Sequence, residues 1–263
     1  MPAREGGLVR FAARVEYDGT DFAGFQFQPG RRTVQGALEA ALTTVSGDGR
    51  VRVSAAGRTD AGVHATGQVI AFTVRDMADE RLARSMDTLL PADVGLRALW
   101  RVEAGWQPRR AARYRAYRYT VWNGPRSPLR ERTALGVRQP LDTAAMARAA
   151  LVLEGRHDFT AFGTAHRQPI RTLHRVRVRR EGRRITIDVI GDAFLRQMVR
   201  SLAAALIRVG RGEATADDLR LALESRPRAF EGAVAPPHGL CLRRVGLGRP
   251  TRTGTDDVDD QDV

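Results

Sequence analysis

The chain has 263 residues, 43% of them hydrophobic, which is enough to bury the core of one large domain or of two packed halves. Its single cysteine, Cys241, excludes an internal disulfide and any multi-cysteine zinc or iron–sulfur site. All 43 basic residues are Arg, which excludes lysine Schiff bases and the Walker A phosphate loop, and the net charge of +13 favours a polyanionic partner such as nucleic acid.

The sequence predicts no membrane segment. No apolar run approaches the roughly 18 residues that a spanning helix needs, and the amino terminus lacks the apolar core of a signal peptide. One cysteine also fits a reducing compartment. We therefore expect a soluble, cytoplasmic protein with no membrane partner.

The first half of the chain is predicted to fold as strand, helix, two strands, helix and strand. Apolar and polar residues alternate where strands are expected, and apolar residues recur at helical spacing after Thr33, a candidate N-cap. The predicted elements are a strand at 11–17, a helix from Thr33, strands near 51–55 and 67–75, a helix near 78–89 and a strand at 94–102.

The second half repeats this order of elements. It begins with a strand in which Tyr117 and Tyr119 share one face, and its last helix begins at Thr215 with the capping signature T-A-D-D. The remaining predicted elements are a helix at 142–153, strands near 171–180 and 184–191, a helix at 193–209 and a closing strand at 239–245.

Two such halves with hairpins predict an α+β fold rather than a doubly wound parallel sheet. The first half is expected at 8–105 and the second at 106–248. Residues 249–263 are rich in Asp and are expected to form an acidic, disordered tail.

The segment 56–65, A-G-R-T-D-A-G-V-H-A, is predicted to be a functional loop. Gly57 and Gly62 permit backbone conformations or close approaches that a Cβ would forbid, so Arg58 and Asp60 can stand on a sharp turn. A carboxylate there is a weak base at neutral pH but a ready oxygen nucleophile. The alternative is that Asp60 only forms hydrogen bonds within the turn.

The segment 109–119 interleaves five Arg with three Tyr on a predicted strand. Aromatic rings among cations suit unpaired bases along a phosphate backbone, although Tyr117 and Tyr119 could equally pack on a strand face. A second basic face is predicted where Arg175, Arg177 and Arg179 alternate with Val. Both segments fit an RNA-binding surface.

Neither a metal nor an organic cofactor is expected. The five His residues are scattered, and the sequence holds no H-E-x-x-H, no C-x-x-C and no G-x-G-x-x-G after a strand. Asp18 and Asp21 are interpreted as turn residues rather than metal ligands.

Six motifs in order make the chain resemble the tRNA pseudouridine synthase A family. They cover roughly residues 8–248, nearly everything except the tail. They are Y-D-G-T-D-F-A-G-F-Q-F-Q at 17–28, A-G-R-T-D-A-G-V-H-A-T-G-Q at 56–68, R-A-Y-R-Y at 115–119, H-D-F-T-A-F at 157–162, F-L-R-Q-M-V-R at 194–200 and H-G-L-C-L at 238–242.

The resemblance implies an isomerase that detaches uracil from its ribose and rejoins it through C5, at positions 38, 39 and 40 of the tRNA anticodon arm. Asp60 falls where the family has its nucleophile, and Arg58 where it flips the target nucleotide. Tyr117 falls where a ring stacks near the target base, and Arg200 where a basic residue pairs with the nucleophile. The family also implies a homodimer, no cofactor and a pseudosymmetric sheet with two ferredoxin-like halves.

The sequence departs from the family pattern in places that leave Asp60, Tyr117 and Arg200 unchanged. Residues 106–110 read W-Q-P-R-R where a Phe-His-Ala-Arg-Phe type segment is usual, and Gln197 replaces a common His. Ala204 or Ala205 replaces a small Gly in the following turn of helix.

Several readings of the chemistry stay open. Asp60 could attack C1′, add to C6 or abstract a 2′ proton to give a glycal. The protein could instead be a non-catalytic RNA-binding protein, or RNA chaperone, that uses the same basic cleft. A metal-dependent nuclease using Asp18, Asp21 and Asp60 is disfavoured because no carboxylate motif is recognised.

Overall fold

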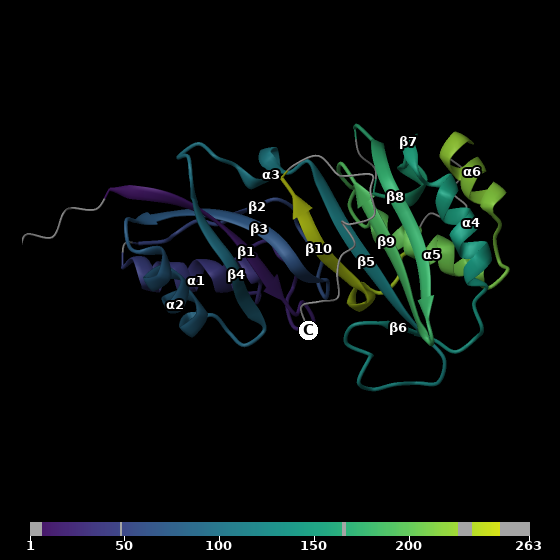
Figure 1. The fold of residues 1–263 in the computed structure, drawn as a ribbon, viewed down its shortest axis with the longest axis horizontal. Coiled ribbons are helices and arrows are strands. Elements are labelled where there is room, and N and C mark those ends of the chain that lie inside the picture. The colour runs from purple at the N-terminus through teal and green to yellow at the C-terminus, as the bar shows by residue number, and fades with distance from the viewer. Residues whose placement is uncertain (1–6, 48, 165–166, 226–232, 248–263) are drawn as a thin grey trace, which may run out of the picture. The chain divides into compact units, whose positions relative to one another are not determined.

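The computed structural model describes residues 7–47, 49–164, 167–225 and 233–247. The chain divides into two compact units, Met1–Ala112 and Arg113–Val263, which are described separately (Figure 1). The predicted acidic tail at 249–263 lies outside the described residues. Within the described ranges, no helix is both long and apolar enough to cross a lipid bilayer.

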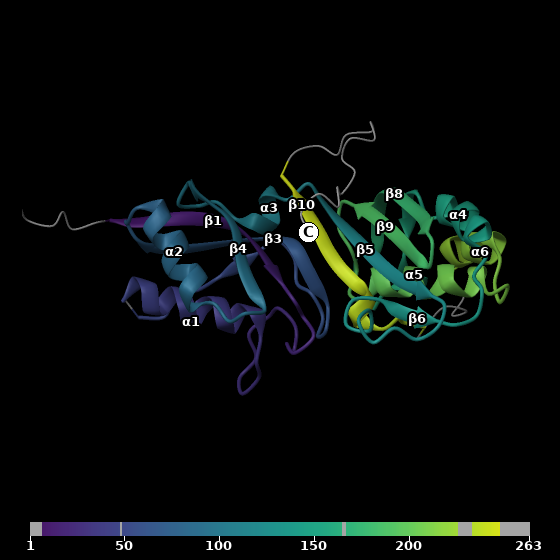
Figure 2. The ribbon, with the colours of Figure 1, turned by 60° about the horizontal axis from the view of Figure 1, so that its bottom comes forward.

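The first unit is a small sheet in which α1 packs against α2 and β3, and α2 packs against β4 (Figure 2). Strand β1 lies between β3 and β4 and is antiparallel to both, and the short β2 pairs with the other edge of β3. The elements are β1 (Leu8–Tyr17), α1 (Val34–Ser46), β2 (Ser54–Ala55), β3 (His64–Arg75), α2 (Asp79–Leu89), β4 (Val94–Val102) and α3 (Pro108–Ala111).

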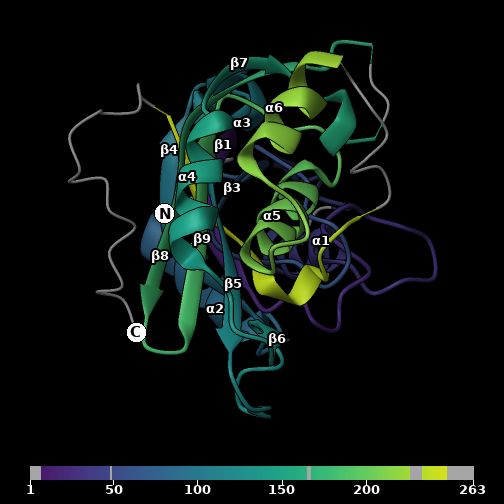
Figure 3. The same ribbon diagram turned by 90° about the vertical axis from the view of Figure 1, so that its right-hand side faces the viewer.

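Strand β5 is the centre of the second unit, whose sheet order is β10–β5–β9–β8–β7, with the short β6 parallel to β5. Helix α4 packs against β8, α5 and α6, and Figure 3 shows α5 and α6 on the same side of β5 and β9. The strands are β5 (Tyr114–Asn123), β6 (Leu135–Val137), β7 (Gly155–Asp158), β8 (Ile170–Glu181), β9 (Arg184–Gly191) and β10 (Leu240–Gly246). The helices are α4 (Thr143–Val152), η1 (Thr160–Phe162), α5 (Met198–Gly210), α6 (Ala216–Ser225) and η3 (Pro237–Gly239).

Both units share one strand order. In the first unit the strands run β4–β1–β3–β2, which is 4-1-3-2 in chain order. In the second unit β5, β8, β9 and β10 give the same 4-1-3-2 order, with β6 and β7 added. This is the ferredoxin-like split β–α–β arrangement, so the predicted α+β fold with two ferredoxin-like halves is confirmed.

The helix starts follow the capping residues in the sequence. The Thr33 side chain accepts a hydrogen bond from the Gly36 N–H, and Asp142 accepts one from the Ala145 N–H. Thr215 and Asp218 exchange hydrogen bonds in a capping box. These contacts satisfy N–H groups that the first turn of a helix leaves without partners.

Three predicted elements differ from the structure. Residues 109–113 were expected in a strand, but Pro108 opens the short helix α3 and the strand begins only at Tyr114. The helix expected from 193 begins at Met198, because Gln197 has a left-handed backbone with φ of 63°. The strand expected at 51–55 is reduced to Ser54–Ala55.

Candidate active site

Asp60 lies in the first unit, on the loop that joins β2 to β3. Its neighbours on the loop differ in exposure, since Arg58 is exposed, Thr59 is buried and Asp60 is half-buried. Gly62 has φ of 76°, a conformation that side chains with a Cβ rarely adopt. Gly57, by contrast, has no positive φ, and a Cβ added there would meet no atom within 4 Å. The expectation that this position needs glycine for its backbone conformation or for a close approach is therefore wrong.

Two buried side chains hold the loop to the sheet. The Tyr17 hydroxyl, at the end of β1, lies 2.9 Å from the Thr59 Oγ1. Gln68, on β3 and 0% exposed, donates from Nε2 to the Gly57 carbonyl at 3.0 Å. Hydrogen bonds buried in this way resist competition from water and fix the backbone on both sides of Arg58.

The segment 18–25 packs directly against the same loop. The Phe25 N–H donates to the Thr59 carbonyl at 3.1 Å, and the Gly62 N–H donates to the Phe22 carbonyl at 3.4 Å. A Cβ on Gly19 would lie 2.0 Å from the Val63 carbonyl oxygen, so only glycine fits there. The sequence placed this segment in a family motif and a turn but gave it no role, and the structure shows that it supports the Asp60 loop.

Asp18 and His64 complete that support. The Gly19 N–H donates to His64 Nδ1 at 3.1 Å, and Asp18 Oδ1 also lies 3.1 Å from this nitrogen. The same Asp18 oxygen accepts the Thr20 N–H at 3.0 Å, as in the turn expected from the sequence. Among the described residues, no group of three or more His, Cys, Asp or Glu side chains is arranged to hold a metal ion.

In the second unit, Tyr117 and Tyr119 share one face of β5 but differ in their surroundings. Tyr117 is half-buried, and its ring meets Phe194 edge to face with centroids 5.2 Å apart. Tyr119 is 0% exposed and donates from its hydroxyl to the Pro236 carbonyl at 2.9 Å. Burial raises the pKa of Tyr119 above its usual range, and the positive charge of Arg200 opposes this shift.

Arg200 lies in the first turns of α5, beside the chain that leads into η3. Its Nε donates to the Ala235 carbonyl at 2.7 Å, and the Ala235 N–H donates back to the Arg200 carbonyl at 3.2 Å. This reciprocal pair fixes the direction of the side chain and joins the F-L-R-Q-M-V-R segment to the one that precedes H-G-L-C-L.

The expected site residues thus fall into two groups. Arg58 and Asp60 share one loop of the first unit, and Tyr117 and Arg200 lie on β5 and α5 of the second unit. In the first group, the backbone is held by buried contacts, while the carboxylate of Asp60 is only half-buried. A half-buried carboxylate on a loop whose backbone is held in place is suited to attack on an electrophilic carbon or to proton abstraction.

Comparison with known proteins gives a consistent picture. A family model described as "tRNA pseudouridine synthase" matches residues 13–99 and 149–246. A tRNA pseudouridine synthase A from Shouchella clausii is 40% identical over 248 residues, covering 92% of this chain and 95% of that protein. One from Thermosipho melanesiensis is 41% identical over 243 residues, covering 90% of this chain and 99% of that protein.

A chain from a solved Cbf5–Nop10–Gar1 complex is also similar, at 12% identity and a TM-score of 0.34. That match covers 89% of this chain and 58% of the other.

Proposed function

The chain belongs to the tRNA pseudouridine synthase family, and on that premise we propose that it converts uridine to pseudouridine at positions 38, 39 and 40 of the tRNA anticodon arm, with Asp60 as the nucleophile. The reaction is an isomerisation, because the same uracil leaves the ribose through N1 and returns through C5. No cofactor is required by that balance of atoms.

The observation that carries the proposal is the support of the Asp60 loop. Thr59 is tied to Tyr17, Gly57 to Gln68, and the backbone at 59 and 62 to the segment 18–25. The protein thereby holds the loop that carries the Asp60 carboxylate in place before any substrate arrives. Such preorganisation is the main way in which a protein lowers a barrier without cofactor chemistry.

The other three residues are proposed to act on the target nucleotide or on Asp60. A uridine in a stem must leave the base stack before its C1′ or C6 can be reached, at a cost of a few kcal/mol. Arg58, exposed two residues before Asp60, is proposed to take the place of the flipped nucleotide. The half-exposed ring of Tyr117 is proposed to stack on the flipped uracil.

Arg200 is proposed to pair with Asp60, and the support for this is its position in the motif at 194–200. A guanidinium beside the carboxylate would keep it ionised and correctly directed. We further propose that the protein acts in the cytoplasm as a homodimer whose basic surfaces share one tRNA, which the net charge of +13 supports.

The proposal is tested by tritium release from tRNA that carries 5-³H-uridine, with wild-type protein and Asp60→Asn in magnesium-free buffer containing EDTA. Release by the wild type and a loss of at least about 10⁴-fold in Asp60→Asn is expected, because removing a catalytic nucleophile has effects of this order. No release by the wild type, with tRNA bound and uncut, would instead support a non-catalytic RNA-binding protein.

A further inference from the structure

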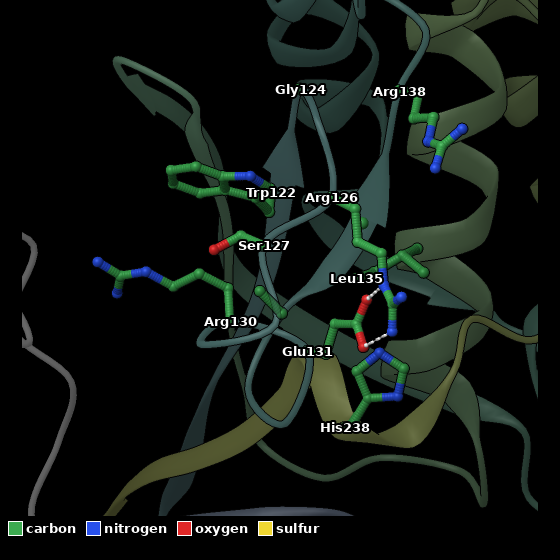
Figure 4. Close-up of a pocket in the computed structure, with 11 residues that line it drawn as sticks. Trp122, Gly124, Arg126, Ser127, Arg130, Glu131, Leu135, Arg138 and His238 are labelled. Atoms are coloured by element: carbon green, nitrogen blue, oxygen red, sulfur yellow. Dashed lines mark hydrogen bonds and ion pairs between the residues drawn. The ribbon is translucent and has the colours of Figure 1, made fainter.

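The second unit contains a pocket of about 390 Å³ that the proposed reaction does not use. It lies where the loop between β5 and β6 meets η3 (Figure 4). Its lining includes an indole, three guanidinium groups, one carboxylate and one imidazole, contributed by Trp122, Arg126, Arg130, Glu131, Arg138 and His238. The volume is at the lower end of the ~300–1,000 Å³ of small-ligand sites, which suits a single nucleotide.

One side of the pocket is an aromatic platform. The Trp122 Nε1–H donates to the Pro125 carbonyl at 2.9 Å, which fixes the direction of the indole ring. The guanidinium carbon of Arg130 lies 5.7 Å from the centre of the same ring. An indole of fixed direction with a cation beside it is a surface on which a nucleobase can stack.

The opposite side of the pocket carries an ion pair with two hydrogen bonds. Arg126 donates from Nε and Nη2 to the two oxygens of Glu131, at 2.5 and 3.0 Å, as Figure 4 shows. The hydrogen bond from Arg126 lowers the pKa of Glu131, and the charge of His238 acts in the same direction. The fork leaves Nη1 outside the pair, so the guanidinium is held in one direction while its remaining edge can meet an anion.

The charge of the whole lining remains positive. Glu131 balances Arg126, whereas Arg130 and Arg138 each add a further positive charge. Figure 4 shows these two guanidinium groups on different sides of the Arg126–Glu131 pair. A ligand that satisfies this pocket must combine a flat aromatic group with a negative charge.

We propose that this pocket binds one nucleotide of the tRNA other than the target uridine, with the base stacked on Trp122 and a backbone phosphate near Arg130 or Arg138. The inference rests on the proposed function, since it assigns a second contact to the same substrate. An acidic protein segment would satisfy the guanidinium groups but would leave the indole without a role, which is why RNA is favoured. A free mononucleotide shares this chemistry and is separated from RNA by experiment.

The test measures tRNA binding and tryptophan fluorescence in the Asp60→Asn background, so that no turnover occurs. Arg130→Gln is compared with Arg132→Gln, which removes the same charge two residues away at a side chain outside the pocket lining. Arg130→Gln should weaken binding at least about fivefold, because a lost hydrogen bond between charged groups costs at least about 1 kcal/mol, and Arg132→Gln less than about twofold.

Trp122→Phe provides the second measurement. Binding of tRNA should quench the fluorescence of the parent protein, and this part of the signal should disappear in Trp122→Phe while circular dichroism stays unchanged. The result would overturn the proposal if both Arg variants lose affinity equally or if the quenching persists in Trp122→Phe.

Two further fluorescence measurements distinguish tRNA from other possible ligands of the pocket. Quenching of Trp122 by free UMP or AMP at concentrations as low as those of tRNA would assign the pocket to a mononucleotide, and a change that follows protein concentration without RNA would assign it to a protein partner. Either outcome overturns the proposal. Tritium release by the wild type is measured on the same tRNA, so a failure of the proposed isomerisation is seen independently of binding at the pocket.

Discussion

The hydroxyl of Tyr17 and the side chain of Thr59 meet at 2.9 Å, and both residues are buried. This contact joins the last residue of β1 to the residue that directly precedes Asp60. The position of Asp60 therefore depends on a hydrogen bond between two residues that lie 42 positions apart in the sequence.

Tyr17→Phe should slow isomerisation about tenfold and lower the free energy of unfolding by about 1 kcal/mol, because a buried hydrogen bond is lost and a small displacement of a nucleophile reduces rate strongly. Thr59→Val should have similar effects. The double variant should be no worse than Tyr17→Phe alone, since both substitutions remove the same contact, and Tyr17→Phe also removes the acceptor of a 3.5 Å hydrogen bond from Gln68 Nε2. Single-turnover rates and urea unfolding measure this, and additive losses would show that the two side chains act separately.

Gly19→Ala should destabilise the first unit by about 3 kcal/mol, because the added Cβ would lie 2.0 Å from the Val63 carbonyl oxygen and overpacking of a tight site costs this much or more. Gly105→Ala is the matched control, since its Cβ meets no atom within 4 Å. Thermal unfolding of both variants tests the prediction. An equal melting temperature for the two variants would contradict the close approach of segment 18–25 to the loop.

Tyr119 should make stability depend on alkaline pH. Burial raises the pKa of Tyr119 above the ordinary value of 10.0, so the folded state holds the phenol proton more tightly than the unfolded state. Its contribution is therefore fully present below pH 10 and is lost as pH rises above 10. The free energy of unfolding should fall more steeply above that pH in the wild type than in Tyr119→Phe, as measured by urea unfolding. Parallel curves would mean that Tyr119 titrates normally.

Gln197→Gly should stabilise the second unit by about 1 kcal/mol, because glycine adopts a left-handed backbone without the strain that a side chain imposes. Among the described residues, Gln197 is the one non-glycine residue with positive φ. Gln197→Ala retains a Cβ and should give no such gain, which makes it the control. Chemical unfolding distinguishes the two, and equal stabilities would show that the backbone at 197 is unstrained.

Local signals in the sequence were enough for most elements. Thr33, Asp142 and Thr215 mark helix starts because a capping side chain acts within three residues of itself. Alternation likewise located β1 and β4, since each buries one face more than the other. The loop of Asp60 was located because its glycines and polar residues interrupt two apolar strands.

Features that depend on distant residues were not predicted. The support of the loop by Tyr17 and Gln68 requires knowledge of which strands pair, and no local pattern supplies it. The pocket brings Trp122 near His238, more than a hundred residues away in sequence. The late start of α5 depends on the backbone of Gln197, and this residue type gives no signal for a left-handed conformation.

The strand order of the two units has a consequence for synthesis on the ribosome. All four strands of the first unit lie between Leu8 and Val102, so the sheet that supports Asp60 can form while the second half of the chain is still being translated. The second unit cannot complete its sheet in this way, because its edge strand next to β5 is β10, Leu240–Gly246. Until that strand emerges, one edge of β5 stays open to pairing with other nascent chains, which makes the second unit the aggregation-sensitive part of biogenesis.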